Sequence, residues 1–402
     1  MKRTVGMLEA IVLALQSAVA LAACPPAATC ALSDAVEQTG PSWALGAADA
    51  MDSIVAAGNL TGDMAVVAAN LATLQTPEQL SAAAAKMVPV IVGQGVQQAN
   101  LTLDELSSLV VLRMEANRDQ RASGGSRDQT VWVRPFGTRA EQQRDGQYPQ
   151  YDVDSNGVAI GYDIDVGRWN VGAAYAFSQP AVRTRSASID QEMDIDSSLI
   201  GLYGYWSGDG GAYADVQAVV GRNNNDTKRR IAFAGINRTA IGEYDTTYGR
   251  LTGALGRVYR LAANLTLTPT ATFGYTYARD QSYTESGAGD LDLVLDDNVS
   301  ESVVFDVDAR LAYALDAAIR LTAHLGGGYR TFTDDASLQG SFVGGGPDFE
   351  TAGPSIEPYL IRAGVGAEYA ATGRLDIQMD DEYDYRGKFR GNLLTATLRC
   401  RI

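Results

Sequence analysis

From about Thr130 to the last residue, apolar side chains recur at every second position of the chain. The stretch 264–278 shows this best, because Leu265, Phe273 and Tyr277 belong to an apolar set that alternates with Thr and Gly. Successive side chains of a β-strand point to opposite faces, so each run indicates a strand with one apolar and one polar face. Aromatic residues gather at the ends of the apolar face, which is typical of a sheet between lipid and a wet lumen. The pattern therefore predicts an all-β membrane barrel over residues 129–402.

The number and spacing of these runs predict the strand count. The runs begin near Thr130, Asn156, Arg168, Ile195, Gly211, Glu243, Asn264, Ser300, Ala318, Pro358, Gly373 and Asn392. Short connections, such as 165–167 and 371–373, alternate with long ones at 140–153, 178–193, 223–241, 281–299 and 333–356. Short turns at one rim and long loops at the other are typical of an outer-membrane barrel with an even number of strands. We therefore predict a 12-stranded antiparallel transmembrane β-barrel. A soluble sandwich would use shorter strands, and a solenoid would show a fixed repeat.

The chain before the barrel has a helical pattern instead. Thr76-Pro77-Glu78-Gln79 is a helix start signal, with a capping Thr and a Pro at the first helical position. Thr102-Leu103-Asp104-Glu105 repeats the signal, and apolar residues then recur every three to four positions. We expect one helix from Leu103 to about Arg121, and earlier helices near 43–57 and 63–74.

The first residues have the features of an export signal. Lys2 and Arg3 precede an apolar stretch, and Ala18-Val19-Ala20 fits a small-residue cleavage site, so residues 1–23 are expected to be a signal peptide. The four residues that end at Cys24 also resemble a bacterial lipoprotein box, which leaves the type of processing open. In an oxidising compartment Cys24 and Cys30 could form a disulfide, unless Cys24 is lipidated.

Composition excludes several classes of function. The formal net charge of −16 argues against a nucleic-acid partner, whose binding surface would be basic. The chain has one histidine, His324, and the sequence places no nucleophile or orienting partner beside it. No metal-ligand spacing is present, so we expect no enzyme activity and no cofactor.

Strand parity predicts which charged side chains face the lumen. The acidic set is Asp163, Asp165, Asp306, Asp308, Glu368, Asp376, Asp380 and Glu382, and the basic set is Arg310, Arg320, Arg362, Arg399 and Arg401. An unpaired buried charge is costly, so a helix inside the lumen must find partners there. We therefore predict that at least one of Arg113, Arg118 and Arg121 meets a lumen carboxylate.

Three stretches carry a resemblance to a known family. The helical segment leads into "TVWVRPFGTRAEQ", with Trp132, Pro135, Phe136 and Gly137; "GVAIGYDIDVGRWNVGAAYAFS" looks like a second hairpin. The stretch with Tyr385, Gly387, Phe389 and Gly391 then precedes the last strand. In this order and length, residues 75–402 resemble the autotransporter β-domain, the outer-membrane translocator of type V secretion.

The resemblance implies a barrel with an α-helix through its pore, which carries an N-terminal passenger across the outer membrane of a Gram-negative bacterium. It implies four segments: a signal peptide at 1–23, a short helical passenger or passenger remnant at 24–101, a linker and plug helix at 102–128, and the barrel at 129–402. The implied partners are outer-membrane lipid, the barrel-assembly machinery, periplasmic chaperones and the chain's own passenger. The implied oligomeric state is a monomer. The N-terminal segment would be periplasmic or at the cell surface.

Two features depart from the family. Its members usually carry a passenger of several hundred residues, whereas residues 24–101 are few and helical, so a truncated parent protein stays open. Members usually end in Phe or Trp, but the expected assembly signal here is Leu394, Leu398 and Ile402. Some members also cleave themselves at a tandem Asn pair, whereas Arg118 follows Asn117, so cleavage is not expected. The alternative function is a non-secreting barrel that acts as a pore or a surface adhesin.

Overall fold

A closed barrel of antiparallel strands forms the larger part of the computed structural model, which describes residues 31–91, 95–122, 129–332, 337–353 and 357–402. Within these residues, twelve strands form the barrel wall. They are β1 (Gln129–Gln142), β2 (Tyr151–Val166), β3 (Trp169–Ser178), β5 (Gln191–Ser207), β6 (Ala212–Phe233), β7 (Ile236–Arg257), β9 (Leu265–Asp280), β12 (Asn298–Ala314), β13 (Ile319–Phe332), β16 (Tyr359–Ala370), β17 (Leu375–Arg386) and β18 (Phe389–Arg401). Two short strands, β4 (Ala181–Thr184) and β8 (Tyr259–Ala262), pair with this wall.

The last strand closes the barrel against the first. β18 pairs with β1 from Thr130 opposite Arg401 to Gln142 opposite Phe389, and β1 also pairs with β2. The backbone N–H of Ile402 donates to the carbonyl of Gln129 at 3.0 Å. Closure satisfies the backbone groups of both edges, which a strand in lipid requires. The predicted 12-stranded antiparallel barrel is therefore confirmed.

Apolar side chains face outward along the whole barrel. Leu255, Leu325 and Val365 each expose more than 60% of their surface. Their neighbours in sequence point inward, so the outer face supplies the apolar belt that the alternation predicted. Among the described helices, none combines the length and the apolar character needed to cross a bilayer.

The β6–β7 hairpin differs from the prediction. Residues 223–241 were expected to be a long loop, but each of the two strands runs for 22 residues and they join at Ala234 and Gly235. Both residues have positive φ, which the tight two-residue turn requires. The side chains of Asn225, Thr227 and Arg229 alternate inward as in the rest of the strand. Because they are polar, the alternation of apolar residues does not indicate a strand here. At about 3.3 Å per residue each strand spans about 70 Å and extends beyond any bilayer.

Five helices precede the barrel within the described residues: α2 (Leu32–Thr39), α3 (Leu45–Ala56), α4 (Gly62–Leu71), α5 (Pro77–Lys86) and α6 (Gly95–Ala122). The expected start of α5 is present, since the Thr76 hydroxyl accepts from the N–H of Gln79. Helix α6 begins at Gly95 rather than at Leu103, so Asp104 lies inside the helix instead of near its start. At about 1.5 Å per residue its 28 residues reach about 42 Å.

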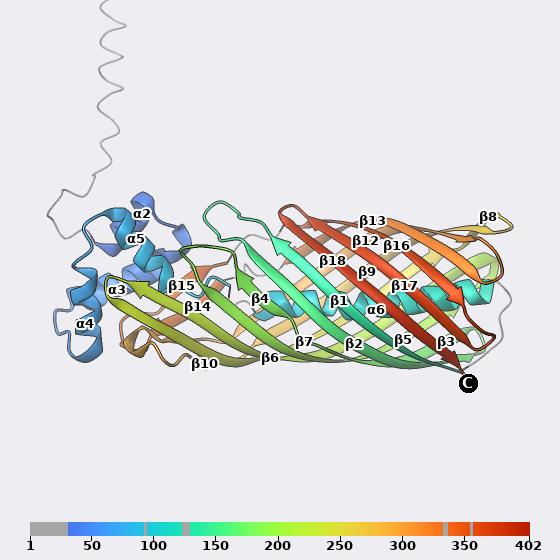
Figure 1. Ribbon diagram of the computed structural model, residues 1–402, viewed down its shortest axis with the longest axis horizontal. Coiled ribbons are helices and arrows are strands. Elements are labelled where there is room, and N and C mark those ends of the chain that lie inside the picture. The colour runs from blue at the N-terminus through green and yellow to red at the C-terminus, as the bar shows by residue number, and fades with distance from the viewer. Residues whose placement is uncertain (1–30, 92–94, 123–128, 333–336, 354–356) are drawn as a thin grey trace, which may run out of the picture.

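Helices α2–α5 lie beyond the loop end of the barrel, opposite the end that holds the C-terminus (Figure 1). We call residues 31–91 the cap. Beneath the cap lie the outer ends of β5, β6 and β7, the short helical turn Gly289–Leu291 and a four-stranded sheet, which together we call the platform. This sheet contains β10 (Tyr283–Thr284), β11 (Leu293–Leu295), β14 (Ser337–Phe342) and β15 (Phe349–Ala352). The long connections expected at 281–299 and 333–356 supply these strands.

Candidate functional site in the barrel lumen

Helix α6 occupies the inside of the barrel along its length (Figure 1). One face of the helix is apolar, and Leu106, Leu109 and Met114 are buried in a cluster with Trp132 and Phe136 of the wall. Trp132 is fully buried, because Gly161 on the neighbouring strand leaves room for the indole ring. The helix therefore packs closest to β5, β6, β7 and β9, in a core that Trp132 and Phe136 complete, rather than lying loose in a water-filled pore.

The first polar contact between helix and wall joins Arg113 to Asp163 of β2. The guanidinium donates to both carboxylate oxygens, with distances of 2.6 and 2.7 Å, and both side chains are 1% exposed. The Tyr203 hydroxyl donates to the same carboxylate at 3.0 Å. Two parallel hydrogen bonds fix both the position and the rotation of an arginine. The expected contact between a helix arginine and a lumen carboxylate is present.

Three further helix residues bind the wall near the turn end. Arg118 donates to Asp215 of β6 at 2.5 Å, and its guanidinium lies 4.0 Å from the Tyr213 ring centroid. Glu115 accepts from Arg310 of β12 at 3.0 Å. Asn117, which was weighed as a cleavage residue, donates from its side-chain amide to the Asn170 oxygen at 2.8 Å. An amide held in this way serves to position the helix.

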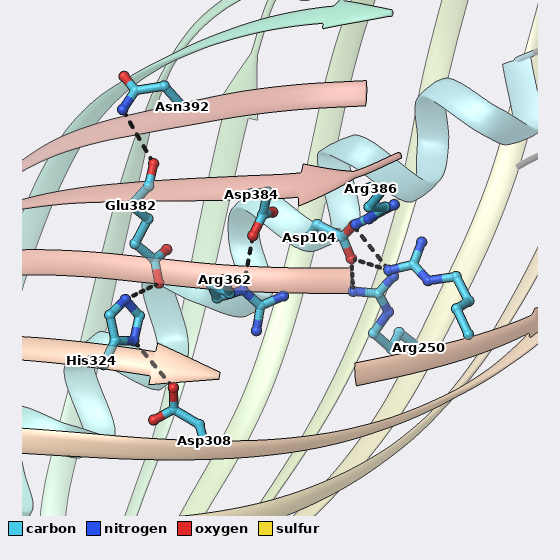
Figure 2. Close-up of polar contacts among 10 residues, drawn as sticks. Asp104, Arg250, Asp308, His324, Arg362, Glu382, Asp384, Arg386 and Asn392 are labelled. Atoms are coloured by element: carbon cyan, nitrogen blue, oxygen red, sulfur yellow. Dashed lines mark hydrogen bonds and ion pairs between the residues drawn. The ribbon is translucent and has the colours of Figure 1, made fainter. Parts of the chain in front are cut away.

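The contacts of Asp104 were not predicted from the sequence. Three arginines converge on its carboxylate: Arg250 of β7 at 2.6 Å, Arg330 of β13 at 3.0 Å and Arg386 of β17 at 2.7 Å. Figure 2 shows Arg250 and Arg386 beside this carboxylate. Asp104 was read as part of a helix start, where an acidic residue needs no further explanation. Because α6 starts earlier, Asp104 lies within the helix, and its side chain points toward the barrel wall.

A polar cavity of about 120 Å³ remains beside the helix. Its walls include Asp104, Glu115, Asp306, Asp308, His324, Arg362 and Glu382. His324 lies between two carboxylates, with Nδ1 3.7 Å from Asp308 and Nε2 3.6 Å from Glu382 (Figure 2). Within the part of the chain that the structure describes, no group of three or more His, Cys, Asp or Glu side chains is placed to hold a metal ion.

Most remaining predicted lumen charges pair along the wall. Glu368 binds Arg399 and Arg320, and Arg401 donates to Asp376 at 2.5 Å. Asp165 accepts from Asn170 at 2.8 Å, and Asp380 accepts from Gln378 at 2.9 Å. Arg362 donates to Asp384 at 3.1 Å. The side chain of Arg121 lies outside the described residues, and so do Cys24 and Cys30.

The three residues of the expected assembly signal point away from the lumen. Leu394, Leu398 and Ile402 are exposed by 51%, 52% and 68%, on the face that meets lipid. Their neighbours Arg399 and Arg401 face inward and are paired, as strand parity predicted. The outward row is thus available to lipid or to another protein during assembly.

A closed barrel with an apolar outer belt and a lumen filled by its own chain defines a plugged outer-membrane β-barrel. The family model "Autotransporter beta-domain" matches residues 131–380, and the chain belongs to this family. Its location is accordingly the outer membrane of a Gram-negative bacterium.

Known proteins show the same similarity. Outer membrane protein A of Rickettsia conorii is 27% identical over 191 residues, which cover 44% of this chain and 9% of that protein. Outer membrane protein B of Rickettsia japonica is 25% identical over 190 residues, covering 45% of this chain and 11% of that protein. The chain thus spans about a tenth of the length of these relatives. The translocator domain of the autotransporter NalP from Neisseria meningitidis has a TM-score of 0.59 at 14% identity, covering 75% of this chain and 98% of that one.

Proposed function

We propose that this barrel exports its own N-terminal segment through its lumen and holds that segment at the cell surface. The single observation that supports this most is the path of α6. Its contact at Asp104 joins it to Arg330 and Arg386, which lie where β13 and β17 end at the loop rim. Its contact at Arg118 joins it to Asp215, close to the start of β6 at the turn rim. The helix therefore links a cap at the loop end to a first strand that begins at the turn end.

The direction of the chain follows from this path. Short turns of outer-membrane barrels face the periplasm, and long loops face the outside. A cap at the loop end, joined through the lumen to β1, is what remains after a segment has passed outward. A segment that stayed in the periplasm would not need to pass through the lumen.

Two epitope tags test export. One tag is inserted in the exposed connection between α3 and α4, at residues 57–61, and a matched tag is inserted in the turn between β16 and β17, at 371–374. Antibody should bind the first tag on intact cells and the second only after the outer membrane is permeabilised. Protection of the first tag on intact cells, with normal amounts of folded barrel, would contradict export.

We also propose that Leu394, Leu398 and Ile402 form the signal that the barrel-assembly machinery reads, because they present an apolar row at the chain end. Changing Leu398 to Asn should lower the amount of folded barrel in the membrane at normal synthesis, measured by heat-dependent gel mobility. Leu255→Asn, which is also on the outward face but in a strand far from the chain end, serves as the control. An equal loss in both variants would argue against a special role of the last strand.

The alternative of a pore has less support, because a pore needs an open lumen and α6 fills this one. An adhesive role of the exported surface is compatible with translocation and is not a competing explanation of the plugged barrel.

A further inference from the structure

We propose that residues 31–91 are a permanent cap, which folds onto the long loops of its own barrel after export and stays there. The partner of the exported segment is thus the platform of the same chain. The inference rests on the proposed function, since the cap reaches the platform by passing through the barrel. It goes further in stating that the described passenger is retained in a fixed position and is not released as a free protein.

The first support is a single hydrophobic core that belongs to both parts. Val36, Met51 and Val67 of the cap are buried in the same cluster as Ile231 and Phe342 of the platform. The platform also supplies Ile195, Leu291, Leu293 and Leu295, all at most 2% exposed. Without the cap, the outer loops would present a large apolar surface to water, which soluble surfaces avoid. The loops of this barrel are therefore built to be covered.

The second support is that cap backbone groups find their partners in the platform. The buried side chain of Gln191 donates to the carbonyl of Val88 at 2.7 Å and accepts from the N–H of Ile91 at 3.1 Å. In the opposite direction, Lys86 donates to the carbonyl of Ala232 at 2.6 Å. A buried polar group without its partner is costly, so these bonds favour one docked position.

A reciprocal contact fixes helix α4 in the same way. Arg238 of β7 donates to both carboxylate oxygens of Asp63, with distances of 2.6 and 2.5 Å. Asp63 also accepts from the N–H of Asp290 at 2.9 Å, while the Asp290 carboxylate accepts from the N–H of Met64 at 2.6 Å. Asp290 thus caps the start of α4 from the platform side.

The third support is a close backbone approach at two glycines. A Cβ atom on Gly46 of α3 would lie 2.5 Å from the carbonyl oxygen of Glu350 in β15. A Cβ atom on Gly346 would lie 2.7 Å from the Ile54 side chain. A Cβ atom does not come this close to another heavy atom, so each glycine permits a contact that a side chain would prevent. A helical domain that did not touch the barrel would not need glycine at the second position of α3, because no neighbour would meet a side chain there.

A cut-and-wash experiment tests retention on the full-length protein. A specific protease site is inserted at residues 57–61, and intact cells are treated with the protease and washed. The cut frees α2 and α3 from covalent attachment to the barrel. We expect the fragment to sediment with the cells and to leave only in denaturant. Release of the fragment by washing alone would overturn the proposal.

The variant Gly46→Ala gives opposite results for a docked and a free helix. If α3 were free, alanine at this first-turn position would leave the helix equally stable or slightly more stable through helix propensity. In the docked helix, the new methyl group meets the backbone of Glu350, and we expect fragment release to rise by roughly tenfold or more. Ser53→Ala, on the exposed face of the same helix, is the matched control and should not increase release. Equal retention in Gly46→Ala and Ser53→Ala would contradict docking.

The two proposals fail in different ways. If the inserted site is not cut on intact cells but is cut after permeabilisation, export itself fails. If the site is cut and the fragment washes away, export holds and the permanent cap fails. If the site is cut on intact cells, and the fragment stays bound in the natural protein but is released more readily in Gly46→Ala, both proposals are supported.

Discussion

Asp104 accepts from arginines on β7, β13 and β17, so one side chain of α6 joins three strands of the wall. The three arginines are at most 8% exposed, and without a carboxylate between them they would repel one another at close range. Removing one partner of a buried ion pair costs more than the pair contributes, because it leaves a charge without compensation.

We therefore expect Asp104→Asn to destabilise the helix-filled barrel by about 3–5 kcal/mol. Thermal unfolding of the purified protein in detergent measures the change. Asp154→Asn is the matched control: its pair with Arg139 is exposed, with side chains 64% and 89% accessible, and should contribute at most about 1 kcal/mol. Equal effects of the two substitutions would show that Asp104 does not anchor the helix.

The contact between Asp63 and Arg238 predicts a pH dependence of the cap. The hydrogen bond from Arg238 lowers the pKa of Asp63 below its ordinary value of 3.8. A carboxyl group with a lowered pKa in the folded state stabilises that state above the unfolded pKa. This stabilisation is lost as the pH falls from about 4 through the folded pKa.

Amide exchange in α4, corrected for intrinsic rates, measures this effect. Protection should be greater in the natural protein than in Asp63→Asn at pH 7, and the difference should shrink as the pH falls below 3.8. A difference of constant size from pH 7 to pH 3 would rule out titration of Asp63 as the cause.

At the scale of elements, α6 shares a core with the barrel wall, because the wall leaves space for large side chains such as Trp132. A Cβ atom on Gly161 would lie 2.3 Å from the Trp132 ring, so Gly161→Ala must displace the indole from the lumen core. We expect a loss of about 1–3 kcal/mol in stability, measured by thermal unfolding. Gly253→Ala is the control, since the nearest atom to its new Cβ would lie 4.0 Å away. If Gly161→Ala is as stable as the control, Trp132 is not tightly packed.

The barrel itself could be predicted from sequence because lipid requires apolar residues at alternate positions, as Leu265 to Tyr277 show. The β6–β7 extension could not, because Asn225 and Thr227 lie beyond the lipid, where alternation no longer has to be apolar. The role of Asp104 depended on where α6 begins, and a capping signal at Thr102 can also occur inside a helix. That a helix arginine meets a lumen carboxylate could be predicted from strand parity and the cost of a buried charge, but that the pair is Arg113 with Asp163 could not. Docking of the cap depends on contacts between residues as distant as Asp63 and Arg238, which no local pattern reveals.

At the scale of the whole molecule, two parts of the N-terminal segment block the barrel lumen. Helix α6 fills the lumen, and the cap lies over the loop end (Figure 1). Both closures come from the segment that the barrel is proposed to export. The central claim is therefore that the N-terminal segment, and not the wall, determines whether the lumen is open.

Conductance across a planar bilayer measures this most directly. The intact protein should show at most rare, small current steps, whereas a chain that lacks residues 31–122 should show steady, large ones, because removing a helix about 10 Å wide empties the lumen. Asp104→Asn in the full-length chain provides a second variant, with transient openings expected if the shortened chain does not fold. Steady, large conductance of the intact protein, equal to that of the shortened chain, would contradict the account.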